Sequence, residues 1–478
     1  MASTETAGTE VLDDGFLERA RDCADFVRDS EDLLLISHID ADGLTSAGVA
    51  SLALDRAGVE HETRFSKQLD ADDLDEIGDA GHDTVLFTDF GSGILDEVTE
   101  RDFTPVVADH HQPAEGADCE YHLNPLLFDI DGSSELSGAG TAYVLARALE
   151  EEVGANKDLA ALAVVGAVGD MQNQGGGLSG ANTAIVSEGV AAGVLEAKQD
   201  LLLFGRQTRP LPKLLEYSTD VFIPGISKNS TGAKELLEDA GVDAKNDEGG
   251  GWRTWADLDE TERERLTNAL FRKCVERGVD SSAIEELVGE TYTLLNEKPH
   301  TELRDASEFS TLLNSTARYE RADVGFAVCK GDRGDALDEA RELLRGHRRN
   351  LRNGVEFVGR NGVTKLENVQ YFDAGDEIQD TIVGIIAGMS YSKSAVDRGM
   401  PIIAFADSDD EGEKKVSSRA TKRLVRKGLN LAEVMGECSR AVGGDGGGHD
   451  IAAGATIPDD AVEEFMQEVD AKVEEQIS

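Results

Sequence analysis

Residues 33–43, LLLISHIDADG, join an apolar run to a sharply polar end. The same pattern recurs at residues 84–91, TVLFTDFG, and at residues 104–113, TPVVADHHQP. Residues 161–170, ALAVVGAVGD, form a fourth apolar run that ends on an acid; periodicity alone leaves it as either a strand or a buried helix. Short apolar runs that alternate with helical segments predict an α/β protein built on a parallel sheet.

Each apolar run is followed at once by aspartate or histidine. Ligands of open α/β sheets bind outside the carboxyl ends of the strands, so we expect these side chains to lie together. His38, Asp40 and Asp42 fall on one side of an extended chain, because alternate residues point the same way. Taken alone, this motif also fits a turn with a helix N-cap at Asp42. Together the four motifs supply more ligands than one divalent ion needs, which favours a pair of ions and phosphoester hydrolysis.

Composition places the chain among globular proteins. Its 478 residues suggest about three domains, and 40% of them are hydrophobic, which excludes a disordered or collagen-like chain. There is no run of 18 apolar residues, and residues 1–15 lack the basic and apolar parts of a signal peptide. Five scattered cysteines without a CxxC motif predict reduced thiols. We therefore expect a cytoplasmic protein.

The charge balance is strongly acidic. Asp and Glu number 95 against 46 Lys and Arg, which gives a net charge of −49. This composition is typical of proteins from a salt-saturated cytoplasm, where a Debye length of about 3 Å or less screens self-repulsion. It predicts a halophilic protein, and it does not exclude a polyanionic partner that binds a local basic patch.

Changes in composition predict the domain organisation. Residues 205–304 combine a proline-containing connector with an acidic, helical insertion, and a further α/β region begins at about residue 305. Within that region, residues 443–455, GGDGGGHDIAAGA, are interpreted as a loop. The predicted parts are a disordered tail, a catalytic domain, the connector with its insertion, and a substrate-binding domain, at residues 1–15, 16–204, 205–304 and 305–478.

The order HIDADG, TDFG, ADHHQP and VGD resembles the four metal motifs of the DHH phosphoesterase superfamily. The later VSSRAT and GGGH resemble the associated DHHA1 substrate domain, and the connector at residues 201–225 is similar to that of the archaeal RecJ-like nucleases. The resemblance covers residues 25–230 and 305–478. It implies a DHH domain with a parallel sheet, a smaller α/β DHHA1 domain, and a cleft between them.

The resemblance also implies roles for individual residues. It assigns Asp89 as the ligand shared by two ions, Asp109 as a support from behind, and His111 as a contact to the scissile phosphate or an aid to proton transfer. Mn²⁺ is the ion it implies, with Mg²⁺ or Co²⁺ left open. The metal ligands would be His38, Asp40, Asp42, Asp89, His110 and Asp170, with Asp109 and His111 as catalytic residues. The substrate-binding residues would be Arg318, Arg419, Gly446, Gly447, Gly448 and His449.

Two basic segments bear on the substrate. Residues 414–427, KKVSSRATKRLVRK, carry seven Lys or Arg and no acid, and residues 345–352, RGHRRNLR, carry four Arg. They suit the phosphates of a strand better than one small molecule, which favours a single-stranded DNA or RNA exonuclease in replication and repair. The alternative explanation for these segments is a salt-bridged face that covers the acidic insertion. The alternatives are a small-substrate phosphoesterase acting on oligoribonucleotides, cyclic dinucleotides or pyrophosphate, and a replisome scaffold that binds GINS, as the resemblance implies for some relatives.

Overall fold

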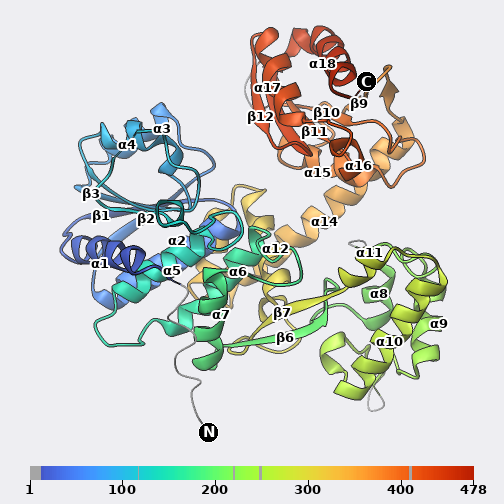
Figure 1. The fold of residues 1–478 in the computed structure, drawn as a ribbon, viewed down its shortest axis with the longest axis horizontal. Helices are drawn as coiled ribbons and strands as arrows, with labels where there is room; N and C mark the ends of the chain where they lie inside the picture. Colours follow the sequence, from blue (N-terminus) through green and yellow to red (C-terminus); the bar gives the residue numbers. More distant parts are fainter. Residues whose placement is uncertain (1–11, 117, 219–220, 247–249, 409–411, 478) are drawn as a thin grey trace. The chain divides into compact units, whose positions relative to one another are not determined.

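The computed structural model describes residues 12–116, 118–218, 221–246, 250–408 and 412–477 (Figure 1). The chain divides into two compact units, the first ending at Arg341 and the second starting at Glu342. Of the predicted tail, residues 1–11 lie outside the described residues, and helix α1 (Asp14–Arg28) begins within the rest of it. No helix in the described part of the chain is both long and apolar enough to cross a membrane.

A five-stranded parallel sheet in the first unit confirms the predicted α/β fold. Its strand order is β2-β1-β3-β4-β5, so β1 has β2 on one side and β3 on the other. This reversal of strand order makes the carboxyl ends of β1 and β3 a topological switch point, where ligands of such sheets bind. The strands are β1 (Leu33–His38), β2 (His61–Ser66), β3 (Thr84–Thr88), β4 (Thr104–Ala108) and β5 (His122–Leu123).

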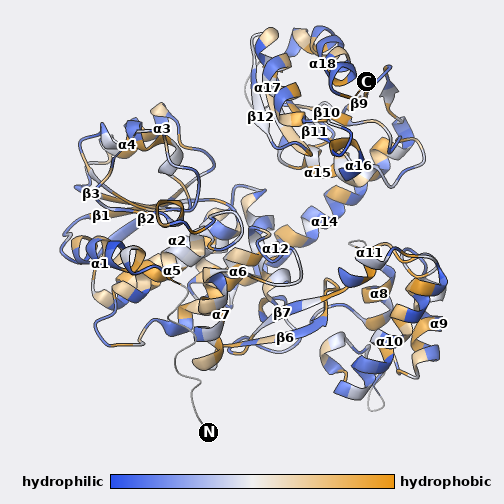
Figure 2. Ribbon diagram, viewed as in Figure 1, coloured by the Kyte–Doolittle hydropathy of each residue, from blue (hydrophilic) through white to orange (hydrophobic). Residues whose placement is uncertain are grey.

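Helices that pack against this sheet and against one another carry parts of the site. The fourth apolar run, whose periodicity fits either a strand or a buried helix, forms the helix α6 (Ala160–Gly169). Its apolar character is visible in Figure 2. Small residues let it approach its neighbours closely: a Cβ at Gly166 would lie 2.4 Å from Asp42 Oδ1. α6 contacts α2 (Ala41–Ala57), α5 (Gly138–Ala148), α7 (Ala181–Ala191) and α12 (Ala306–Ala317).

A helical lobe extends from a two-stranded antiparallel ribbon of β6 (Leu195–Leu201) and β7 (Val288–Leu294). The predicted acidic, helical insertion also contains the strand β7, because pairing with β6 overrides the acidic, helix-like composition there. The lobe has its own core, with Trp255 fully buried in it. Its helices are α8 (Leu211–Glu216), α9 (Ser230–Ala240), α10 (Glu260–Glu276) and α11 (Ser281–Glu285).

Residues 305–341 fall in the first unit, whereas our predicted boundary for the second domain is at residue 305. The physical reason is packing, since α12 contacts α6 and α2, and α13 (Ala322–Cys329) contacts α2. The long helix α14 (Asp335–Asn361) contains the division between the units. The predicted cleft between domains stays a prediction.

A six-stranded mixed sheet forms the second unit, in the order β12-β13-β11-β10-β9-β8. Residues 443–455 were interpreted as a loop, and this was wrong. They form a hairpin of β12 (Asp445–Gly448) with β13 (Ala452–Pro458), which β11 (Glu413–Arg419) holds in the sheet despite the low strand propensity of glycine. The other elements are β8 (Thr364–Lys365), β9 (Gln370–Asp373), β10 (Ile402–Asp407), α15 (Asp380–Ser390), α16 (Lys422–Val425), α17 (Leu431–Ala441) and α18 (Val462–Ile477).

Candidate metal centre

The turn from β1 into α2 places three predicted ligands at the switch point. His38 ends β1, and Asp40 is the N-cap of α2, where its Oδ1 accepts a hydrogen bond from Gly43 N at 3.0 Å. His38 Nδ1 lies 3.3 Å from Asp40 Oδ2 and 3.7 Å from Asp89 Oδ2. Asp42 lies in the first turn of α2 and is buried. Because Asp40 caps α2, the turn holds the side chains of His38 and Asp40 close to Asp89, which follows β3.

Asp89 follows β3 directly and has a left-handed backbone, with φ of +62°. That conformation costs a non-glycine residue roughly 1–2 kcal/mol, so packing must hold it. The carboxylate is buried, and a Cβ at Gly138 would lie only 2.3 Å from Oδ1. Although Oδ1 lies 3.2 Å from His110 Nε2, it accepts no hydrogen bond from the described residues. A buried carboxylate oxygen in this state fits a cation as its partner.

His110 presents one ring nitrogen to the acids. Its Nδ1 donates a hydrogen bond to Gly132 O at 2.6 Å, because a carbonyl oxygen can only accept. Nε2 of the neutral ring then keeps its lone pair and faces Asp89 Oδ1 at 3.2 Å and Asp42 Oδ2 at 3.8 Å. A backbone carbonyl that fixes the ring in this way is the usual arrangement for a metal-binding histidine.

Asp42 and Asp170 face His110 from two helices. Asp42 accepts from Gly138 N at 2.7 Å and from Ala139 N at 3.0 Å, at the start of α5, where the helix dipole favours a negative charge. Asp170 is the C-cap of α6, and its Oδ2 lies 3.9 Å from His110 Nδ1.

Three groups of possible ligands result among the described residues, one of which consists of Asp89, Asp109, His110 and His111. The other two are here called the two ligand clusters. Ligand atoms of His38, Asp40 and Asp89 lie within 4.8 Å of one another, and so do those of Asp42, His110 and Asp170. The carboxylate of Asp89 lies between the clusters, with Oδ2 toward His38 and Oδ1 toward His110. Mixed histidine and carboxylate ligands suit divalent transition metals such as Mn²⁺, and Asp89 can contribute one oxygen to each of two ions.

The carboxylates of the site repel one another unless cations or protons neutralise their negative charge. Burial and the charges of Asp89 and Asp170 raise the pKa of Asp42 well above its ordinary value. Burial alone would lower the pKa of His110, but Asp89 and Asp42 raise it well above its usual range. Burial would also lower the pKa of His38, but Asp40 and Asp89 raise it to about 10. Without metal, the site therefore holds protons that a bound cation would displace.

The remaining residues of the ADHHQP motif take different positions. Asp109 is fully buried, and its Oδ1 accepts from His111 Nδ1 at 2.8 Å. Burial would raise the pKa of Asp109, yet this hydrogen bond and the histidine charges hold it well below its ordinary value. The side chain of His111 is 56% exposed. Asp109 therefore orients the ring of His111.

The predicted substrate residues fall in both units. Arg318 follows α12 in the first unit, where burial lowers the pKa of its guanidinium and the charge of Asp40 acts in the opposite direction. Asn314 Oδ1 of the same helix accepts a hydrogen bond from Ala41 N at 3.1 Å. The others lie in the second unit. Arg419 ends β11, Gly446, Gly447 and Gly448 lie on β12, and His449 follows β12 and is exposed.

Several residues that shape the site were not predicted from sequence. Gly132 supplies the carbonyl for His110, and Gly138 leaves room for Asp89. Asn124 Nδ2 donates to His111 O at 2.8 Å, and Ser92 N donates to Asp109 Oδ2 at 3.0 Å. These groups act through backbone atoms or from distant turns, so no local motif identifies them.

The displaced protons make metal binding depend on pH. We expect the affinity for Mn²⁺ to rise with pH by about tenfold per unit for each displaced proton. Because the pKa of His38 is about 10, the rise should continue above pH 7. Calorimetric titration at pH 6, 7 and 8, in buffers of different ionisation enthalpy, counts the protons released. An affinity that is constant across this range would contradict the assignment of these groups.

Comparisons with known proteins agree with the geometry. The DHH-CID domain model matches residues 203–288, and the DHHA1 domain model matches residues 366–475. The uncharacterized protein MJ0831 of Methanocaldococcus jannaschii is 30% identical over 454 residues, which are 93% of this chain and 93% of that protein.

Solved structures share the fold. RecJ of Thermus thermophilus in complex with Mn²⁺ matches with a TM-score of 0.59 and 18% identity. The match covers 97% of this chain and 55% of the RecJ chain, so the present chain spans about half the length of that protein. CDC45 of Entamoeba histolytica matches with a TM-score of 0.64 and 12% identity, over 96% of this chain and 98% of that one. The chain belongs to the same family as MJ0831, and its own two domain matches make it a member of the DHH/DHHA1 phosphoesterase superfamily.

Proposed function

We propose that this DHH-family phosphoesterase is a metal-dependent exonuclease that removes nucleotides from the end of single-stranded DNA or RNA during replication or repair. The observation that carries the proposal is the Asp89 carboxylate lying between two ligand clusters. Two divalent cations held about 3.5–4 Å apart supply an activated water and stabilise the attacking and leaving oxygens of a phosphodiester. His38, Asp40 and Asp89 would hold one cation, and Asp42, His110, Asp170 and Asp89 the other.

His111 is the residue best situated to handle a proton on the substrate. Its Nδ1 is held by Asp109, so the ring keeps a fixed orientation while Nε2 is available for a phosphate oxygen. The hydrogen bond from His111 to Asp109 raises the pKa of His111. A protonated Nε2 can donate a hydrogen bond to a phosphate oxygen, or pass its proton to a leaving oxygen.

The second unit carries groups of its own that suit the binding of phosphates. Arg419 of β11 pairs with Ala452 of β13, and Gly448 of β12 pairs with Ala453. Arg419 and Gly448 therefore lie at the same end of the sheet, two strand spacings or about 10 Å apart. β12 is an edge strand, and a Cβ at Gly447 would meet no atom within 4 Å, so its backbone is open to a phosphate.

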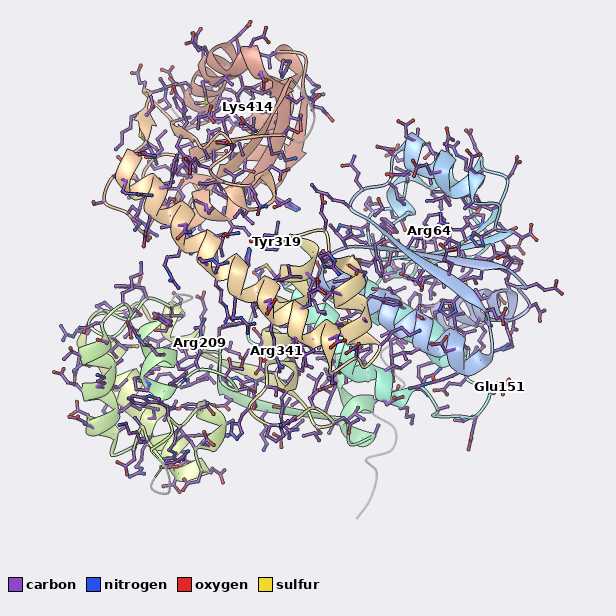
Figure 3. All side chains as sticks on the ribbon, turned by 180° about the vertical axis from the view of Figure 1, so that it is seen from behind. Arg64, Glu151, Arg209, Tyr319, Arg341 and Lys414 are labelled. Carbon is purple, nitrogen blue, oxygen red and sulfur yellow. The ribbon has the colours of Figure 1, made fainter. Side chains whose placement is uncertain are left out.

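A group of exposed cations next to Arg419 supports a polymeric substrate. Lys422, Arg423, Arg426 and Lys427, here called the α16 cations, are exposed and form no ion pair within the described ranges. Lys414, labelled in Figure 3, differs because it pairs with Asp373 at 3.1 Å and with Asp407 at 2.7 Å. In a chain of net charge −49, unpaired cations at one place suit successive phosphates. A pyrophosphate would need only one compact cluster.

A scaffold role remains the alternative of a different class. The chain shares its fold with CDC45, and binding to GINS or other replisome components is a prediction from resemblance alone. A scaffold does not need two ligand clusters around a buried, orphaned carboxylate oxygen, so their presence favours an enzyme. An active nuclease that also binds a replisome is compatible with this view.

Digestion of labelled strands tests the activity. In Mn²⁺ and multimolar KCl, we expect stepwise shortening of 5′- or 3′-labelled single-stranded DNA or RNA. Asp89→Asn keeps the shape of the side chain but removes the shared charge, so activity should fall at least about 100-fold with the fold intact. The parallel reactions contain dinucleotides and pyrophosphate. Turnover of these alone would contradict the exonuclease proposal, as would full activity of Asp89→Asn.

The α16 cations provide a test of polymer binding. Arg423→Gln/Arg426→Gln should raise the KM for a long strand several-fold and leave turnover of a dinucleotide unchanged. The dependence of log affinity on log salt should flatten by roughly 1.4, or 0.7 per lost phosphate contact on a single strand. Lys365→Gln/Lys472→Gln removes the same charge from ion-paired sites in the same unit and serves as the control. Equal effects of the two double variants would show that the α16 cations have no specific role.

A further inference from the structure

Gln172 lies behind the cluster of Asp42, His110 and Asp170, although no sequence motif singles it out. The residue follows the C-terminus of α6 and is only 4% exposed. Its Nε2 donates to Gly132 O at 2.8 Å and to Asp170 Oδ2 at 2.9 Å. Both partners can only accept when Asp170 is ionised, so the amide group has one possible orientation.

Asn182 holds this amide from the other side. It lies in the first turn of α7, is buried, and donates from Nδ2 to Gln172 Oε1 at 2.7 Å. Both N–H groups of the Gln172 amide and its oxygen therefore have partners. A buried amide whose groups are all satisfied is rigid, because any rotation leaves a polar group unpaired in a low-dielectric interior.

The carbonyl of Gly132 connects Gln172 to His110. It accepts from Gln172 Nε2 at 2.8 Å and from His110 Nδ1 at 2.6 Å. Only glycine permits this close approach of the loop, since a Cβ at position 132 would lie 2.0 Å from His110 O. Gln172 thus sets the position of the carbonyl that orients His110, and it contacts the carboxylate of Asp170 directly.

The backbone on either side of Gln172 forms a turn that directs its side chain inward. Met171 has a left-handed backbone with φ of +60° and an exposed side chain. Gln172 N donates to Ala167 O at 3.0 Å and closes the turn after α6. The turn thus directs Gln172 inward, while Met171 takes the unfavourable conformation at the surface.

The other cluster is held by different contacts. Asp40 is fixed by the amide of Gly43, and His38 by its place at the end of β1. The side chain of Gln172 has its hydrogen-bond partners in Gly132, Asp170 and Asn182, which lie outside that cluster. Asp42 is also fixed separately, by the amides of α5.

We propose that Gln172 is a positioning residue that fixes His110 and Asp170 for one of two divalent cations and leaves the site of the other unaffected. The inference rests on the two-cation site of the proposed function. It predicts that loss of the Gln172 side chain weakens binding at one ion site and not at the other, a difference that a purely structural role of Gln172 would not produce.

The test is a titration of the full chain with Mn²⁺ in multimolar KCl, followed by electron paramagnetic resonance. Gln172→Met keeps the length of the side chain but removes its hydrogen bonds. We expect one ion to bind about 10–100-fold more weakly and the other with unchanged affinity. At two equivalents of Mn²⁺, the spin-coupled signal of the wild-type pair should give way to that of an isolated ion. Gln174→Met, at an exposed position of the same turn, is the matched control and should bind two ions normally.

Two results would overturn the proposal. One is binding of two ions to Gln172→Met with wild-type affinities, and the other is equal weakening of both. If Gln172→Met does not fold, Asn182→Leu decides by the same titration, because it frees the amide of Gln172 and should weaken the same single ion by a smaller factor. The assay contains no substrate, so absence of nuclease activity in the wild type would contradict the proposed function and leave this result intact.

Discussion

The placement of the Asp89 carboxylate is the constraint on which the site depends. A left-handed residue directly after a buried strand turns its side chain back toward the switch point, and Gly138 leaves the space that the carboxylate fills. The ends of β1 and β4 then bring His38 and His110 to opposite oxygens of the same group. Neither cluster would be connected to the other without Asp89, so this one backbone conformation determines whether two cations can share a ligand.

Repulsion among carboxylates is the cost of this arrangement. Asp42, Asp89 and Asp170 lie close together in a chain that already carries a net charge of −49. The structure limits the cost by giving individual oxygens backbone donors, as Gly138 N and Ala139 N do for Asp42, and by placing histidines between acids. Divalent cations would complete the balance, so that binding of metal would be coupled to loss of protons. The α16 cations occur instead in the second unit, where a polyanion can meet unpaired positive charge.

The fold and most of the candidate ligands could be predicted from the sequence because they follow directly from strands. His38, Asp89 and His110 each come at or just after the end of an apolar run, and a parallel sheet brings such positions together. Asp170 was predicted as a ligand although its segment was ambiguous, and the structure places it after a helix, since α6 is surrounded by other helices. Gly132 and Gln172 could not be predicted, because their contacts join turns that are distant in sequence. The second-unit residues depended on resemblance, and their roles stay predictions.

Anomalous diffraction from crystals of the full chain grown with Mn²⁺ tests the central claim most directly. The account predicts two manganese peaks about 3.5–4 Å apart, one on each side of Asp89, with Oδ2 bound to the ion near His38 and Oδ1 bound to the ion near His110. A single peak, or two peaks that do not share Asp89, would contradict it.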